Sequence, residues 1–275
     1  MYSYEQWKQD RIKLILEHFK GYREGLVVGL DTTLYQHDGD EQVFLLPSVN
    51  DVPLIWSNPV QVDEHEIQIQ QMYIPYNDDS LTAIKTARRM LSLLCYASHG
   101  LPIIEKAIHG GPNPGIPVAG DKYRYPSLNG YDIKLLVSAV DLNALTEQNW
   151  ITLAYYRLGC NADSEYYKFL SYLQVVEVSF MNVGNDIHKW LDAQSGIVEV
   201  AEWLKTIPSS RKISSRLRGE TRALCAHVAN NNTGNPDIIT DPDDIESVRQ
   251  VQHDLGIIEK LAIERLRSIE PIERL

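Results

Sequence analysis

The chain has 275 residues, of which 44% are hydrophobic and 23% are charged, and its formal net charge is −11. This composition excludes a disordered or fibrous protein and supplies enough apolar residues for one large core or two smaller ones. The negative charge argues against a protein that coats nucleic acid, because such binding depends on neutralising phosphates. Any contact with nucleic acid must therefore come from a local basic patch.

The expected location follows from the apolar runs and the cysteines. No apolar run approaches the roughly 20 residues that cross a bilayer, and charged residues interrupt the first 20 positions, where a secretory signal would need an apolar stretch. The three cysteines, Cys95, Cys160 and Cys225, are odd in number and widely spaced, which is typical of buried reduced thiols. We therefore expect a cytoplasmic protein with no membrane contact, metal or cofactor.

The N-terminal half predicts a mixed architecture. Apolar residues at helical spacing predict a helix over residues 4–20 that ends near Gly21. Between residues 26 and 76, short runs of β-branched and aromatic residues separated by turn residues predict antiparallel strands. A second helix is expected to begin with Ser80 as its cap, to end at Gly100 and to pack on the sheet.

Beyond the second helix, residues 110–129 are rich in Gly and Pro and predict a long surface loop. Strand signals then disappear, and residues 141–275 predict a purely helical bundle. We expect helices at 150–158, from a cap at Asn161 or Asp163 to 180, at 196–205, from a cap at Ser209 or Ser210 to about 227, and from Asp241 onward. The predicted fold class is α+β, with a small mixed domain of antiparallel strands and helices over 1–140 and an all-α bundle over 141–275.

A basic stretch in the second half is the local patch that RNA binding would need. Its cations are Lys205, Arg211, Lys212, Arg216, Arg218 and Arg222, and the only acid among them is Glu220. We predict that Lys212, Arg216 and Arg218 contact RNA phosphates. The alternative is that this stretch is a solvated helix face, which is the usual role of a charge run.

Arg222 and His227 end the same predicted helix. Residues five apart on an α-helix are about 140° apart around its axis, so these two side chains cannot meet within one copy. Two copies related by a two-fold axis can bring each Arg to the partner's His. Such a cleft suits RNA cleavage without a metal, because imidazoles can transfer the protons and guanidiniums can stabilise the charge on phosphorus.

The pattern Arg222-x-x-x-x-His227 at the end of a helix in a C-terminal bundle resembles the signature of the HEPN superfamily. Members of this superfamily are often dimeric, metal-independent ribonucleases of toxin–antitoxin, CRISPR and antiphage systems. The likeness continues upstream, where residues 153–158 and 166–177 are similar to bundle helices of the bacterial methylamine utilisation proteins of J type. It covers roughly residues 145–270 and leaves the N-terminal domain without a relative.

The resemblance implies that Arg222 and His227 are catalytic in a homodimer formed through the C-terminal bundle, in a bacterial defence or toxin-type system. The N-terminal domain would then sense a ligand or a regulatory protein. Active members commonly have a polar residue after the arginine, whereas this chain has Ala223. The alternative is therefore a non-catalytic dimerisation or ligand-binding or RNA-binding module. In a purely structural interpretation, Arg222 pairs with Glu220 or a helix neighbour and His227 only complements the helix dipole.

Two other groups of polar residues have structural interpretations. Asp63-Glu64-His65-Glu66 carries metal-binding side chains, but consecutive strand residues point to opposite faces, so we predict no metal site there. Glu177 lies among valines and is expected to be partly buried and paired, with Arg157 or Arg222 as its partner.

Overall fold

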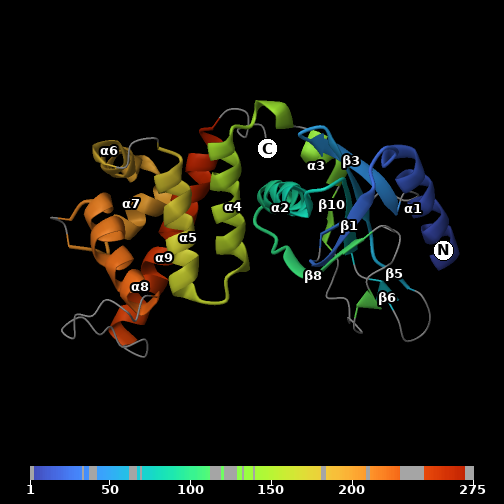
Figure 1. The fold of residues 1–275 in the computed structure, drawn as a ribbon. Helices are drawn as coiled ribbons and strands as arrows, with labels where there is room; N and C mark the ends of the chain where they lie inside the picture. Colours follow the sequence, from blue (N-terminus) through green and yellow to red (C-terminus); the bar gives the residue numbers. More distant parts are fainter. Residues whose placement is uncertain are drawn as a thin grey trace. The chain divides into compact units, whose positions relative to one another are not determined.

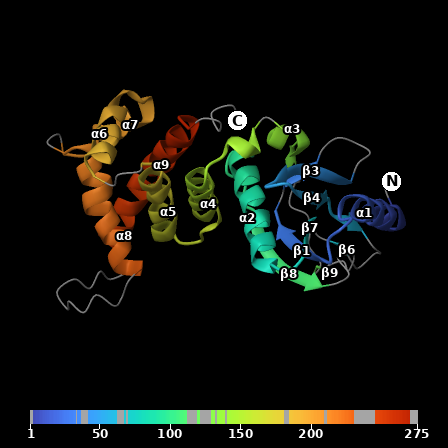
Figure 2. The same cartoon turned by 45° about the horizontal axis from the view of Figure 1, so that its top comes forward.

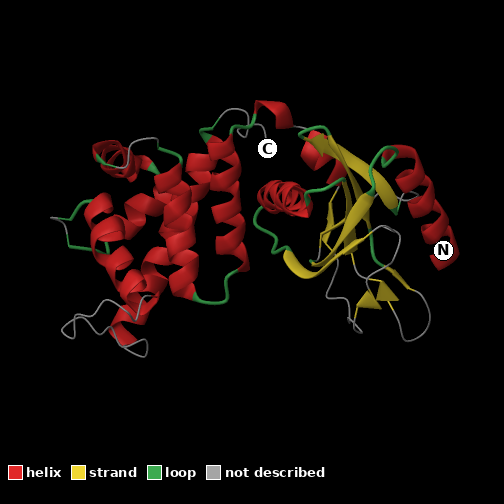
Figure 3. Ribbon diagram, in the orientation of Figure 1, coloured by secondary structure: helices red, strands yellow, loops and turns green. Residues whose placement is uncertain are grey.

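The computed structural model describes residues 3–32, 34–36, 42–61, 67–68, 70–111, 119–120, 129–131, 133–138, 140–180, 184–208, 211–229 and 245–269. The chain divides into two compact units, Met1–Leu145 and Thr146–Glu273. All strands among the described residues belong to the first unit, and the described part of the second unit is helical (Figure 3). The predicted α+β class, with strands in the N-terminal part and helices in the C-terminal part, is confirmed.

The main sheet of the first unit has five antiparallel strands in the order β3-β4-β7-β1-β8 (Figure 1). Its strands are β1 (Glu24–Asp31), β3 (Val43–Val49), β4 (Val52–Ser57), β7 (Gln70–Tyr76) and β8 (Ile104–Gly111). The short strands are β2 (Leu34–Gln36), β5 (Val60–Gln61), β6 (Ile67–Gln68), β9 (Ala119–Gly120) and β10 (Asn129–Tyr131). β2 pairs in parallel with β10, and β5, β6 and β9 form an antiparallel sheet. The antiparallel strands predicted within residues 26–76 are therefore present.

Helices cover both faces of the main sheet. α1 (Tyr4–His18) lies on one face and α2 (Ser80–Ala97) on the other (Figure 2). The α1 side holds a buried cluster in which Trp7 of the helix packs with Val27, Ile55 and Tyr73 of the strands. α3 (Ile133–Ser138) and the short helix η1 (Leu142–Ala144) complete the unit.

Local signals explain where the first two helices begin and end. The Ser3 hydroxyl accepts from the Gln6 N–H at 3.1 Å and caps α1, and Gly21 follows its end with a φ of +95°. Asp79, and not the predicted Ser80, caps α2, because its carboxylate accepts from the N–H of Leu81 and Thr82. An aspartate one residue earlier reaches two free N–H groups at once, which the sequence signal at Ser80 did not reveal.

The predicted loop over residues 110–129 is partly wrong. Gly110 and Gly111 end β8, where they pair with Leu26 and Gly25 of β1. A Cβ on Gly110 would come 2.9 Å from the Tyr76 hydroxyl, so this glycine permits close packing within a strand. Residues 112–118 and 121–128 of the predicted loop lie outside the described residues.

The second unit is a bundle of helices. They are α4 (Glu147–Asn161), α5 (Glu165–Val178), α6 (Asn185–Ala193), η2 (Gln194–Gly196), α7 (Val198–Leu204), η3 (Ser215–Thr221), α8 (Arg222–Ala229) and α9 (Ile245–Arg267). α5 is central, because it packs against α4, α8 and α9. The apolar spacing predicted α4, α5, α7 and α9, but it did not reveal α6, a short helix with only two buried residues, Ile187 and Leu191.

The predicted helix caps of the bundle were less accurate than the helices. α5 begins after Ser164, whereas we expected Asn161 or Asp163 as its cap. Asn161 instead ends α4, a helix that opens with a capping box between Thr146 and Asn149. The other two predicted starts, at Ser209 or Ser210 and at Asp241, lie outside the described residues.

A glycine allows α4 and α5 to pack closely. A Cβ built on Gly159 of α4 would lie 2.6 Å from Cε1 of Tyr172, a buried ring on α5. The Tyr172 hydroxyl donates to Glu259 Oε1 of α9 at 3.2 Å, so this hydrogen bond fixes the position of the ring against Gly159. The contact between the two helices therefore depends on the absence of a side chain at residue 159.

We expect Gly159→Ala to lower the free energy of unfolding by about 1–3 kcal/mol, because the new methyl group overpacks this contact and outweighs the helix propensity gained. Urea denaturation followed by circular dichroism measures the change. Gly256→Ala on α9 is the matched control, since a Cβ there meets no atom within 4 Å. Equal stabilisation by both substitutions would contradict the prediction.

Candidate functional site

The predicted basic stretch lies on a helix with a widened turn. η3 is π-helical and continues directly into α8. At the junction the N–H of Arg222 donates to the carbonyl of Leu217, five residues earlier. An α-helix would use the carbonyl four residues earlier, so the π turn holds one extra residue. Residues five apart along η3 therefore come to the same side of the helix, as Arg216 and Thr221 do.

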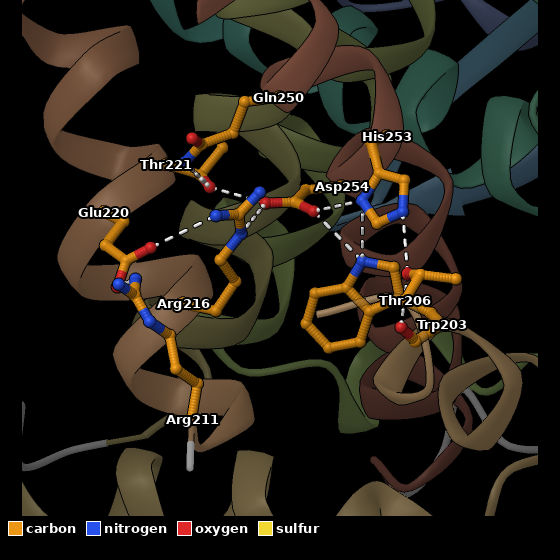
Figure 4. A network of polar contacts seen from close by, with 9 residues as sticks. All are labelled: Trp203, Thr206, Arg211, Arg216, Glu220, Thr221, Gln250, His253 and Asp254. Atoms are coloured by element: carbon orange, nitrogen blue, oxygen red, sulfur yellow. Dashed lines mark hydrogen bonds and ion pairs between the residues drawn. The ribbon is translucent and has the colours of Figure 1, made fainter. Parts of the chain in front are cut away.

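A buried carboxylate on α9 receives both of these side chains. Asp254 is 0% exposed. Its Oδ2 accepts from Arg216 Nε at 2.8 Å and from Thr221 Oγ1 at 2.6 Å (Figure 4). Its Oδ1 accepts from Trp203 Nε1 at 3.0 Å and lies 2.9 Å from His253 Nδ1. A buried carboxylate is costly without such partners, so the network fixes η3, α7 and α9 to one another.

The charges of this network balance. Arg216 also pairs with Glu220 through Nη1 at 3.1 Å, and Glu220 in turn pairs with Arg211. Two guanidiniums thus face two carboxylates, Glu220 and Asp254, along one line of contacts (Figure 4). The expected pairing of Arg222 with Glu220 is not among these contacts, since Glu220 is engaged by the other two arginines.

Arg218 is anchored on a different side of the bundle. Its Nε donates to Glu177 Oε1 at 2.8 Å, and its Nη1 lies 2.7 Å from His188 Nε2. Glu177 is 6% exposed, so the expected burial and pairing of this carboxylate are present. The predicted partner is wrong, however, because Arg218 takes the place expected for Arg157 or Arg222. Arg218 lies 41 residues from Glu177 in sequence, and only the packing of the bundle brings the two side chains together.

Most of the basic stretch is consequently engaged in internal ion pairs. The side chains of Arg216 and Arg218 are each 14% exposed, and Lys205 pairs with Glu202 at 2.6 Å. Among the described residues of this stretch, only Lys212 and Arg222 are exposed with no ion pair. Lys212 is therefore more accessible to a phosphate than Arg216 and Arg218, the other two predicted contacts.

The two predicted catalytic residues lie on α8. Arg222 is the first residue of this helix and its side chain is exposed. His227 lies five residues further along α8; the structure describes its backbone but not its side chain. Because α8 is α-helical from Arg222 onward, the angle of about 140° between the two positions holds.

The inner side of α8 is fixed in the bundle by Cys225. Burial raises the pKa of this thiol to about 12, and the nearby negative charge of Asp254 adds to the shift. The thiol therefore stays protonated at neutral pH, which makes it a packing residue and a poor nucleophile. As predicted, Cys95 and Cys225 are buried, and all three cysteines are free; Cys160 is only partly buried.

The described residues contain no group of three or more His, Cys, Asp or Glu side chains placed to hold a metal ion. The segment Asp63-Glu64-His65-Glu66 lies outside them. None of the described helices combines the length and the apolar character that a membrane crossing requires.

Comparison with known families finds a similarity for the helical part of the chain. Residues 152–267 match the family model of the methylamine utilization protein MauJ. This match runs from α4 to α9 and covers less than half of the chain. The predicted similarity to these J-type proteins is thereby confirmed for the helical unit, which is MauJ-like, while the HEPN resemblance stays a prediction. No curated protein and no solved structure matches the chain.

The residues that organise the MauJ-like unit, Asp254 and His253, were not among the predicted site residues. A signal for Asp254 was present, because it lies three residues after Val251 and four before Ile258 on the predicted apolar stripe of α9. A carboxylate on a buried stripe implies partners in the core. The identity of those partners could not be predicted, since it depends on the π turn in η3.

Proposed function

We propose that the MauJ-like unit is a HEPN-like domain that binds RNA and cleaves it without a metal, as a homodimer. The observation that supports this proposal is the contrast between Arg222 and its neighbours. Arg211, Arg216 and Arg218 are held by carboxylates of the bundle, whereas Arg222 is exposed and no described residue pairs with it. An exposed arginine on a rigid helix is available to a phosphate.

The roles of the two residues follow from their chemistry. A His227 imidazole would remove the proton of a ribose 2′-hydroxyl, whose oxygen attacks phosphorus, and a second imidazole would give a proton to the leaving 5′-oxygen. Arg222 would stabilise the negative charge on the phosphoryl oxygens. Because the two positions diverge by about 140° on α8, the proposal needs a second copy, with α8 at the two-fold axis.

A non-catalytic RNA-binding or dimerisation module is the second candidate. Ala223 favours it, because a methyl group follows Arg222 where the resemblance leads us to expect a polar side chain. The acidic net charge of −11 also favours a narrow binding surface over extensive RNA contact. In either case, we propose that the N-terminal α+β unit senses a ligand or a regulatory protein.

Cleavage of end-labelled single-stranded RNA in EDTA tests the proposal. We expect the wild-type protein to cut, and His227→Ala and Arg222→Gln each to lower the cleavage rate by about 10²-fold or more, since each removes a group that acts in the transition state. Light scattering on the same samples measures whether the protein is a dimer. Arg267→Gln is the control, because Arg267 is an exposed arginine of the same unit whose surface pair with Glu264 contributes little.

The outcomes separate the two candidates. If no variant cleaves RNA but Arg222→Gln and Lys212→Gln bind it more weakly than the wild type, the protein is the non-catalytic RNA-binding module. Cutting that survives in His227→Ala, or a monomer at every concentration, would contradict the shared cleft. Arg216 is unsuitable for such a test, because its loss would leave the buried Asp254 carboxylate without its charge partner and destabilise the bundle.

A further inference from the structure

An open pocket of about 330 Å³ lies where α1 ends and β1 begins. All the residues that line it belong to the continuous segment from Ile15 to Glu24. On the basis of the sensing role proposed for the N-terminal unit, we propose that this pocket binds carboxylic acids with an apolar chain of medium length. The pocket involves no residue of the helical unit.

A tight turn after α1 forms the pocket. The Phe19 N–H donates to the Ile15 carbonyl at 2.9 Å at the end of the helix, and the Tyr22 N–H donates to the Phe19 carbonyl at 3.1 Å. Between these two hydrogen bonds, Gly21 has a φ of +95°, which residues other than glycine rarely adopt. The chain therefore reverses within a few residues, and the last turn of α1 and the start of β1 line the same pocket.

The wall that α1 contributes is apolar and continues into the core of the unit. Phe19 is 7% exposed and belongs to the buried cluster of Trp7, and the partly buried Ile15 packs against this cluster. Leu16 also lines the pocket but is 72% exposed. An apolar chain in the pocket would cover Leu16 and remove its side chain from water, which is favourable in proportion to the area buried. The pocket therefore favours a ligand with an apolar part.

The polar side of the pocket has one cation that is available to a ligand. Lys20 is exposed and forms no ion pair with any described residue. The other two charged residues of the lining have partners. Arg23 pairs with Asp78 at 3.5 Å, and the Glu24 carboxylate accepts from the Tyr76 hydroxyl. A carboxylate on the ligand would complement the Lys20 ammonium group.

The volume of the pocket indicates the size of the ligand. Small-molecule sites commonly have volumes of roughly 300–1,000 Å³, so this pocket lies at the lower end of the range. A water molecule takes up about 30 Å³ in the liquid, so the pocket has room for about ten non-hydrogen atoms. Octanoate is a carboxylate of this size with an unbranched apolar chain.

Isothermal titration calorimetry of the full-length protein with sodium octanoate tests the proposal. We expect saturable binding with a Kd of about 1 mM or lower. From hexanoate to octanoate the Kd should fall about 2- to 4-fold for each added CH₂ group, because more of the chain leaves water. Octylammonium has a chain of similar length and the opposite charge, and it should bind at least about 3-fold more weakly than octanoate.

Two substitutions, each with a matched control, locate the site. Leu16→Gln should raise the Kd of octanoate about 5-fold or more, because an amide replaces part of the apolar wall. Leu81→Gln should leave it unchanged, since Leu81 is 74% exposed on α2 and does not line the pocket. Lys20→Gln should raise the Kd about 2- to 5-fold. Lys13→Gln should not, since Lys13 is an exposed lysine of α1 outside the pocket.

Several outcomes would overturn the proposal. They are the absence of saturable binding up to about 10 mM octanoate, equal Kd values for Leu16→Gln and Leu81→Gln, and octylammonium binding as tight as that of octanoate. Circular dichroism checks that the variants are folded, which the exposure of Leu16 and Lys20 leads us to expect. None of these measurements involves RNA. A pocket that binds no octanoate would therefore leave the proposed RNA cleavage standing, and a protein that cuts no RNA would leave the binding test valid.

Discussion

Replacing Asp254 by Ala is expected to lower the free energy of unfolding of the helical unit by about 3–5 kcal/mol, the cost of breaking a buried ion pair on one side. Arg216 would lose its buried partner and keep only Glu220, while the donors of Trp203 and Thr221 would lose their acceptor. The loss is large because each donor remains buried after the carboxylate is removed. Urea denaturation followed by circular dichroism measures it.

Asp186→Ala is the matched control for this substitution. Asp186 lies on α6 of the same unit, and its side chain is 63% exposed, with a 3.6 Å surface pair to Lys189. Such a pair contributes little, so we expect a change within about 0.5 kcal/mol. A double variant that also carries Arg216→Ala should be less destabilised than the sum of the two single variants, because the pair is lost only once. Similar small effects of the Asp254 and Asp186 substitutions would contradict the network.

The elements of the fold could be predicted from sequence where periodicity and composition agree. Apolar residues at helical spacing are strong in α2, α5 and α9, and short runs of β-branched and aromatic residues occur in β3 and β4. Prediction failed where the signal is short, as in α6, or where glycine serves packing, as at Gly110. Caps were misplaced because neighbouring Asp and Ser residues compete for the same role, and only the backbone decides between them.

The candidate site was harder to predict, for a geometric reason. The period of an α-helix predicts the side of the helix on which each arginine of the basic stretch lies. The π turn in η3 contains one extra residue, so the side chains lie at other angles around the axis than this period predicts. Arg216 and Arg218, predicted at the surface, therefore point into the bundle. Arg222 follows the π segment and keeps its predicted exposure. The His253–Thr206 contact joins residues 47 apart in sequence, a spacing that no motif would have indicated.

Replacing Trp7 by Ala is expected to lower the stability of the first unit by about 3–5 kcal/mol, the range for a large buried aromatic residue. Trp7 is 0% exposed, and its Nε1 donates to Ser57 Oγ at 2.6 Å. The guanidinium of Arg11 lies 4.6 Å from its ring centroid and is itself 3% exposed, so removal of the ring takes from a buried cation one of its two aromatic neighbours and leaves Tyr73, at 5.7 Å. α1 should therefore detach from the sheet.

Hydrogen exchange measured by segment shows where the stability is lost. The two units have separate cores, so we expect protection to fall in α1, β4 and β7 and to stay unchanged in α5 and α9. Leu16→Ala is the control on the same helix, since Leu16 is 72% exposed and its loss should change little. An equal loss of protection in α5 and α9 would mean that the chain unfolds as one cooperative body. The effects of Asp254→Ala and Trp7→Ala would then appear in every segment, because a shared transition transmits any local loss to the whole protein.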